Sequence, residues 1–228
     1  MFLETLLADA VGHAFAATPV LPRLLASFPA VYAEDGTTVA LPADAADRRP
    51  GTNGNGPQAG AAALKIYTRW ELTTGALDRI VLSAGKQSDQ TSARTIPGPP
   101  PGSLLLADLG LFDANRLGAW TTAGRYWISR VPTRITLTCE GRTQPLDAFL
   151  RDRTAASVDA PIRLGENAVP CRLVARRCPP AVAAQRLARV VETARRKQRV
   201  VSAAQRVLCA WTVHATNIPG TVLNPVEV

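Results

Sequence analysis

The chain has 228 residues, of which 46% are hydrophobic and 19% are charged. This is enough apolar sequence for one sizeable core and too much for a disordered chain, and it excludes collagen, coiled coils and low-complexity proteins. The 26 Lys and Arg residues outnumber the 18 Asp and Glu residues, so the net charge is +8. Such a basic protein is suited to a polyanionic partner.

The apolar N-terminus, residues 1–17, lacks the features of a signal peptide. No basic residue precedes Arg23, and Glu4 and Asp9 interrupt the apolar run. The pattern therefore predicts an amphipathic helix in a lead-in that covers 1–27.

No run approaches the roughly 18 apolar residues that span a bilayer. The four cysteines contain no C-x-x-C pair. We therefore expect a soluble cytoplasmic protein with reduced thiols and without zinc.

The segment 28–131 predicts an α/β arrangement with a mixed sheet. Five runs rich in β-branched, aromatic or aliphatic residues are expected to be strands, at 28–41, 64–72, 77–83, 103–108 and 126–131. The second and third flank a turn and should pair antiparallel, whereas the unbroken apolar fourth should lie centrally, buried on both faces. Residues 44–63, rich in Gly and Pro, predict a loop. Asp113 should cap a short helix that ends at Gly124.

The sequence pattern changes after Pro132, where a smaller β-rich segment and a long helix are expected. Residues 134–139 and 170–175 predict strands of a smaller β-rich segment, and 208–215 predicts a further apolar strand. Between them, 181–206 predicts one long helix, because its apolar residues recur about every 3.5 positions and its other faces carry arginine.

Most of the net positive charge lies in this last helix and the strand before it. The 35 residues from Arg172 to Arg206 carry ten basic groups and one acid, Glu192, a net charge of +9, whereas the remaining 193 residues are nearly neutral. Such clustering is typical of a phosphate-facing surface. The candidate DNA-binding residues are Arg172, Arg176, Arg177, Arg186, Arg189, Arg195, Arg196, Lys197 and Arg199.

Two carboxylates are candidates for a metal site. Asp108 closes the apolar fourth strand, where ligands bind in α/β sheets, although an Asp there can also cap the next turn. Asp35 precedes Gly36, and an Asp-Gly pair between two β-rich runs is typical of a hairpin turn. On neighbouring strands the two carboxylates would offer Mg²⁺ the oxygen ligands it prefers. The sequence contains no phosphate-binding loop, dinucleotide motif or recognisable nucleophilic triad.

Four blocks in order carry a resemblance to a known family. They are DGT at 35–37 followed by VALP, ALKI at 63–66 with LTTG at 72–75, LLADLGLFD at 105–113, and GRYWISR at 124–130. Together they resemble the bacterial insertion-sequence transposases of the IS-four type. The resemblance implies an RNase H-like core over 28–131, whose adjacent first and fourth strands each present one Asp of a D-D-E triad, matched here by Asp35 and Asp108.

The resemblance also implies the chemistry and the partner. The carboxylates would hold Mg²⁺ or Mn²⁺ for strand nicking and strand transfer at transposon ends. It implies a β-rich insertion over 132–217, whose basic helix lies against DNA. Transposon-end DNA is thus the expected partner, the protein should be nucleoid-associated when DNA-bound, a homodimer is compatible with the sequence, and no membrane is expected.

The chain departs from the family pattern at its C-terminus. The third acid of the triad, a Glu on a helix after the insertion, has no counterpart, because 218–228 matches only the lead-in to that helix. Glu227 lies in this lead-in, and Glu192 is better explained by pairing with neighbouring arginines at helical spacing. We therefore expect a truncated transposase domain with little activity of its own.

Two alternatives from other classes remain open. One is a non-catalytic DNA-binding remnant that interferes with a full-length transposase, which would be insensitive to Asp108→Asn. The other is an RNase H-like nuclease that recruits Glu192 or Glu166 as its third acid, which requires one of these side chains close to Asp35 and Asp108.

Overall fold

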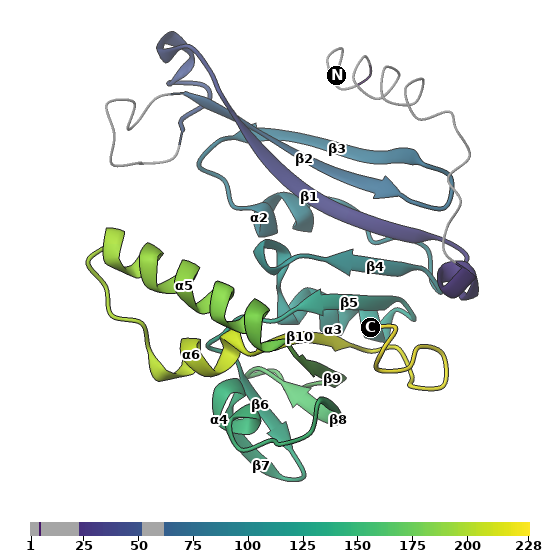
Figure 1. Cartoon of the computed structure of the whole chain (residues 1–228). Helices are drawn as coiled ribbons and strands as arrows, with labels where there is room; N and C mark the ends of the chain where they lie inside the picture. Colours follow the sequence, from purple (N-terminus) through teal and green to yellow (C-terminus); the bar gives the residue numbers. More distant parts are fainter. Residues whose placement is uncertain (1–4, 6–22, 52–61) are drawn as a thin grey trace.

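The described residues form one mixed sheet of ten strands (Figure 1). The computed structural model describes residue 5 and the ranges 23–51 and 62–228, so nearly all of the expected N-terminal helix and half of the Gly- and Pro-rich loop, residues 52–61, lie outside the described residues. The strand order is β3-β2-β1-β4-β5-β10-β9-β8-β6-β7. The strands are β1 (Val31–Ala40), β2 (Ala63–Glu71), β3 (Ala76–Ala84), β4 (Leu104–Ala107), β5 (Tyr126–Arg130), β6 (Thr136–Cys139), β7 (Arg142–Pro145), β8 (Ser157–Leu164), β9 (Val169–Arg177) and β10 (Trp211–Thr216).

The expected mixed α/β class is confirmed. The pairs β1–β4 and β4–β5 are parallel, and the other neighbouring strands of the sheet pair antiparallel. The α-helices of the described part are α2 (Asp89–Arg94), α3 (Ala114–Thr122), α4 (Leu146–Arg151), α5 (Pro180–Arg196) and α6 (Ala203–Cys209). Within the described ranges, no helix combines the length and the apolar character needed to cross a membrane.

Several local predictions are confirmed with their physical reasons. The antiparallel hairpin of β2 and β3 turns through 73–75, where Gly75 has a φ of 72°. The Asp113 carboxylate caps α3 by accepting hydrogen bonds from the amides of Asn115 and Arg116 at 3.1 and 3.4 Å. Gly124 follows α3 with a φ of 67°, which suits a residue without a Cβ atom.

The predicted turn at Asp35-Gly36 is wrong, because both residues lie inside the continuous ten-residue strand β1. A side chain at position 36 would have to displace a neighbouring carboxylate. A Cβ atom on Gly36 would lie 2.2 Å from Oδ1 of Asp89, a carboxylate that α2 brings against the strand. The same oxygen accepts a hydrogen bond of 2.8 Å from Nζ of Lys65 on β2. Close approach of a neighbouring side chain, and not a chain reversal, accounts for this glycine.

The predicted single helix over 181–206 is also wrong, because the chain breaks after α5. Gln198 takes a left-handed φ of 50°. The amides of Gln198 and Arg199 bond back to the carbonyls of Arg195 and Ala194, at 3.1 and 2.8 Å, which is a Schellman end. Ser202 then starts α6 with a capping box to Gln205. Residues 208 and 209, expected in a strand, are the last turn of α6.

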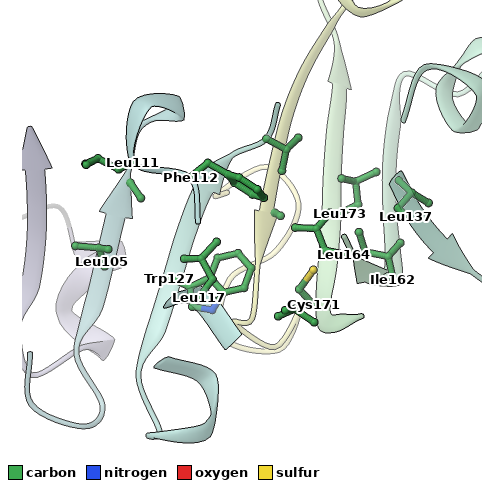
Figure 2. Close-up of a cluster of buried hydrophobic side chains, with 14 of the residues drawn as sticks. Leu105, Leu111, Phe112, Leu117, Trp127, Leu137, Ile162, Leu164, Cys171 and Leu173 are labelled. Atoms are coloured by element: carbon green, nitrogen blue, oxygen red, sulfur yellow. The ribbon is translucent and has the colours of Figure 1, made fainter. Parts of the chain in front are cut away.

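The β-rich segment after Pro132 continues the same sheet. Strand β10 pairs with β5 on one side and β9 on the other, so strands from both halves of the chain share one core. Figure 2 shows this core running from Leu105 on β4 through Trp127 on β5 to Leu164 and Leu173 on β8 and β9. The sequence patterns do not predict α2, α4, β7 or β8.

A buried ion pair joins β1 to α3 beneath the sheet. The Glu34 side chain has no exposed surface and accepts a hydrogen bond of 2.8 Å from Nη2 of Arg116 on α3. The buried Arg69 lies 3.9 Å from the same carboxylate oxygen. Burial and the neighbouring carboxylate of Glu34 raise the pKa of the Tyr67 hydroxyl. Because burying charges is costly unless they are paired, the fold depends on this pairing.

We expect Arg116→Met to lower the free energy of unfolding by about 3–5 kcal/mol, because it leaves the Glu34 carboxylate buried without its closest cation. Urea unfolding followed by circular dichroism would measure the change. The control is Arg195→Met, which removes an arginine whose side chain is 79% exposed and pairs with Glu192, itself 42% exposed; there the loss should stay below about 1 kcal/mol. Equal losses in the two variants would contradict a special role for the buried pair.

A methyl group at Gly36 should be more costly than one at Gly110, although both glycines approach the same carboxylate. At Gly110 the added Cβ atom would lie 3.6 Å from Oδ2 of Asp89, an ordinary contact. We expect Gly36→Ala to destabilise by about 1–3 kcal/mol by displacing Asp89 from Lys65, and Gly110→Ala to cost less than about 1 kcal/mol. Thermal unfolding of both variants measures the difference, and equal midpoints would refute it.

Candidate functional site

The two candidate carboxylates lie at matching positions on adjacent parallel strands. The β1–β4 pairing ends with Glu34 opposite Ala107, and Asp35 and Asp108 are the next residue on each strand. Because side chains alternate between faces, both aspartates belong to the face that carries Val31 and Leu104. Both side chains are exposed. The expectation that the first and fourth strands lie side by side is therefore confirmed.

The opposite face of the sheet carries the buried ion pair. Tyr32 and Glu34 alternate with Val31 and Asp35 along β1, and Tyr32 belongs to the large core while Val31 packs in a small cluster with Ile218 and Leu223. We call the face that carries Val31, Leu104 and these C-terminal residues the tail face. Asp35 is thus exposed to solvent on the tail face, whereas Glu34, the residue before it, is buried on the opposite face.

A cation from the next strand contacts Asp108. Nη1 of Arg130, the last residue of β5, lies 3.0 Å from Oδ1 of Asp108, because the β4–β5 pairing ends with Ala107 opposite Ser129. The amide of Leu109 lowers the pKa of Asp108 and Arg130 lowers it further, although partial burial acts in the opposite direction. Asp108 also stands at the N-cap position of the turn Leu109–Leu111, so its carboxylate faces both the first amide of this turn and Arg130.

The row of polar groups continues onto β10. His214 is paired opposite Arg130, and burial together with the positive charge of Arg130 lowers the pKa of this imidazole. Along the tail face, neighbouring strands therefore present Asp35, Asp108, Arg130 and His214 in register. Sequence reasoning missed the last two; Arg130 ends the GRYWISR block, but only the strand pairing places it beside Asp108.

The donor set of the two aspartates fits a hard divalent cation. Both are exposed carboxylates with oxygen donors, the ligands that Mg²⁺ prefers together with water. The Arg130 guanidinium, a positive group, already contacts Asp108, as a bound cation would. In the described part of the chain, no three His, Cys, Asp or Glu side chains come together as a metal site, so neither Glu166 nor Glu192 completes the pair.

Glu192 is instead bound within α5. Its carboxylate pairs with Arg195 at 3.0 Å and with Arg196 at 2.8 Å, three and four residues further along the helix. These two arginines lower the pKa of the Glu192 carboxylate, Arg196 more strongly. The expected pairing of this acid with its helical neighbours is confirmed.

The candidate DNA-binding residues fall into two groups. Three of them are used inside the protein. Arg172 pairs with Asp159 and also donates to the carbonyls of Ile218 and Leu223, so it fastens the C-terminal segment to β9. Arg177 stacks on Trp211 at 4.5 Å. Arg186 donates to the Trp211 carbonyl at 3.0 Å and to the Thr212 hydroxyl at 3.1 Å.

The second group is exposed. Helix α5 has no buried residue and projects past the sheet (Figure 1), and the Arg195 and Arg196 side chains are 79% and 76% exposed. Within the described ranges no ion pair or hydrogen bond holds the side chains of Arg176, Arg189, Lys197 and Arg199. These exposed side chains on and beside α5 form the basic surface.

A cavity of about 630 Å³ lies between this helix and the end of the sheet beside Asp108, and neither aspartate lines it. Its wall includes Leu109, which directly follows Asp108, then Arg130 and His214 from the sheet, and Arg186 and Arg189 from α5. The described residues that line it include three arginines and no acidic side chain. The cavity is therefore electropositive and begins at the carboxyl ends of β4 and β5.

Comparison with known proteins identifies relatives of one kind. The chain is 22% identical, over 89% of its length, to the transposase for insertion sequence element IS231F of Bacillus thuringiensis subsp. israelensis. It is 30% identical, over 47% of its length, to the transposase for IS231B of Bacillus thuringiensis subsp. berliner. It spans 46% of the first relative and 22% of the second. No family model matches. These similarities support an identity among the transposases of bacterial insertion sequences, of which the chain spans less than half the length.

Proposed function

We propose that this chain contributes an RNase H-like catalytic core to DNA transposition, in which a divalent cation assists cleavage and transfer of DNA strands. The observation that carries the proposal is the placement of Asp35 and Asp108 at matching positions on adjacent parallel strands. The order β3-β2-β1-β4-β5, with α2 before β4 and α3 before β5, supports the RNase H-like assignment. The two similar transposases supply the reaction class.

The residues of the site have distinct roles in this proposal. Asp35 and Asp108 hold Mg²⁺ or Mn²⁺ through exposed carboxylate oxygens, on strands whose relative position is set by backbone pairing. When bound there, the cation would stabilise negative charge that develops on oxygen atoms around the reacting phosphorus. The pair of Glu34 and Arg116 positions Asp35 from below by anchoring β1 to α3.

The basic surface of α5 binds the DNA backbone in this proposal. Its exposed arginines and Lys197 are suited to phosphate contacts that carry no base specificity. The cavity extends from α5 to Leu109 and Arg130, the residues that adjoin Asp108, and its arginines would attract a DNA strand toward the carboxylates. The substrate is double-stranded DNA at the transposon ends, and the working oligomer is proposed to be a homodimer.

Removal of either aspartate should abolish most cation binding. We expect Asp35→Asn and Asp108→Asn each to weaken Mn²⁺ binding by at least about tenfold, because each removes a charged oxygen donor. Calorimetric titration of the purified 228-residue chain would measure the dissociation constants. The control Asp152→Asn changes an exposed acid at the end of α4 and should leave the binding unchanged. Mn²⁺ binding that both site variants retain in full would contradict the proposed metal site.

Exposed cations on α5 should contribute to DNA affinity through salt-dependent phosphate contacts. We expect the pair of changes Arg195→Ala and Arg196→Ala to weaken DNA binding irrespective of sequence. It should flatten the slope of log affinity against log salt by up to about 1.8, since each phosphate contact contributes roughly 0.9. Fluorescence anisotropy with a labelled duplex at several salt concentrations measures the slope. An unchanged slope would count against α5 as the DNA surface.

A second candidate function is favoured by the exposed basic side chains of α5, such as Arg195 and Arg196. The chain would then bind DNA without catalysis and interfere with an intact transposase. In that case the salt-dependent DNA binding would persist in Asp108→Asn, and the cation titrations would show no difference between the wild-type chain and the aspartate variants.

A further inference from the structure

Arg130 stands between two places that need a positive charge. On one side it pairs with Asp108 at 3.0 Å, and on the other its side chain lines the acid-free cavity that leads to α5. The Asp108 and Arg130 side chains are 61% and 60% exposed. Exposed ion pairs of this kind contribute only about 0–1 kcal/mol, so either partner is readily exchanged.

The cavity carries positive charge from Arg186 and Arg189, in addition to that of Arg130, and none of the described residues that line it is acidic. Arg186 donates to the Cys178 thiol, the Trp211 carbonyl and the Thr212 hydroxyl, which are all neutral acceptors. Arg189 has no ion pair or hydrogen bond within the described ranges. The positive charge of Arg186 and Arg189 would repel the Arg130 guanidinium if it moved from Asp108 into the cavity. An anion bound in the cavity would remove this repulsion. A DNA phosphate supplies such an anion.

We infer that Arg130 is shared between the metal site and the DNA, and so couples the binding of the two. Without a divalent cation, Arg130 neutralises Asp108. A divalent cation on Asp108 displaces the guanidinium by repulsion, and the guanidinium turns into the cavity, where together with Arg186 and Arg189 it holds a phosphate of the DNA. This inference rests on the proposed function. It adds that cation and DNA favour each other's binding, by the same factor in each direction.

The test compares cation and DNA binding in the wild-type chain, Arg130→Gln and Arg130→Lys. We expect Arg130→Gln to bind Mn²⁺ about 3- to 10-fold more tightly than the wild-type chain in the absence of DNA, because the competing cation is gone. Arg130→Lys keeps the charge and should remain close to the wild-type value. Calorimetry gives the Mn²⁺ dissociation constants.

The second measurement is the ratio of DNA affinities with and without Mg²⁺, at constant ionic strength, for a short labelled duplex. The ratio should fall in Arg130→Gln, because the group that carries the coupling is absent, and should be kept by Arg130→Lys. The matched control is Arg142→Gln, an exposed arginine on β7 at the far edge of the sheet, which should change neither quantity.

The outcomes separate this inference from the proposed function. If the wild-type chain binds Mn²⁺ and Arg130→Gln binds it equally well or more weakly, the role of Arg130 is overturned and the metal site is not. A wild-type chain that binds no Mn²⁺ would overturn the metal site, and the inference with it. A lower DNA-affinity ratio that appears equally in Arg142→Gln would assign the effect to overall charge and would also overturn the inference.

Discussion

The parallel pairing of β1 with β4 is the constraint on which the candidate site depends. The pairing ends with Glu34 opposite Ala107, and on each strand the next residue along the chain is an aspartate, Asp35 within β1 and Asp108 just after β4. A shift of the register by one residue would turn one aspartate to the opposite face. That register is well defined, because Val31 and Leu104 are buried on the tail face while Tyr32 and Leu105 are buried on the other.

Two successive residues of β1 have opposite environments, and the contrast explains how an exposed carboxylate can be placed firmly. Glu34 is buried and bound to Arg116, whereas the Asp35 carboxylate is exposed and accepts a hydrogen bond of 2.8 Å from the amide of Gly36. The buried partner links the strand to α3, and α3 packs against β5, the strand that ends in Arg130. The charged groups of the tail face are thus placed by interactions on the other face.

The elements that could be predicted from the sequence are those specified by local chemistry. The β2–β3 hairpin follows from strand patterns around a Gly turn, β4 from its apolar run, and α3 from the Asp113 cap and Gly124. The register of β1 with β4 follows the family pattern. In contrast, the role of Gly36 depends on Asp89, and the position of Arg130 depends on β4, so both need long-range pairing that no local pattern contains.

The break between α5 and α6 was within reach of sequence reasoning. Ser202 and Gln205 have the spacing of a capping box, which marks a helix start in the middle of the predicted long helix. The regular recurrence of apolar residues conceals this break, since the period continues across it. The burial of Glu34, in contrast, could not be predicted, because nothing in the local sequence distinguishes Glu34 from the exposed Asp35 that follows it.

Helix α5 takes no part in the core, since none of its residues is buried. Except at Arg186, whose guanidinium is bonded to β10, substitutions along it should therefore change the charge of this surface with little consequence for folding. If α5 binds DNA as proposed, selection can adjust the affinity without disturbing the sheet that carries the aspartates. In related proteins, this helix is where we expect the sequence to diverge fastest.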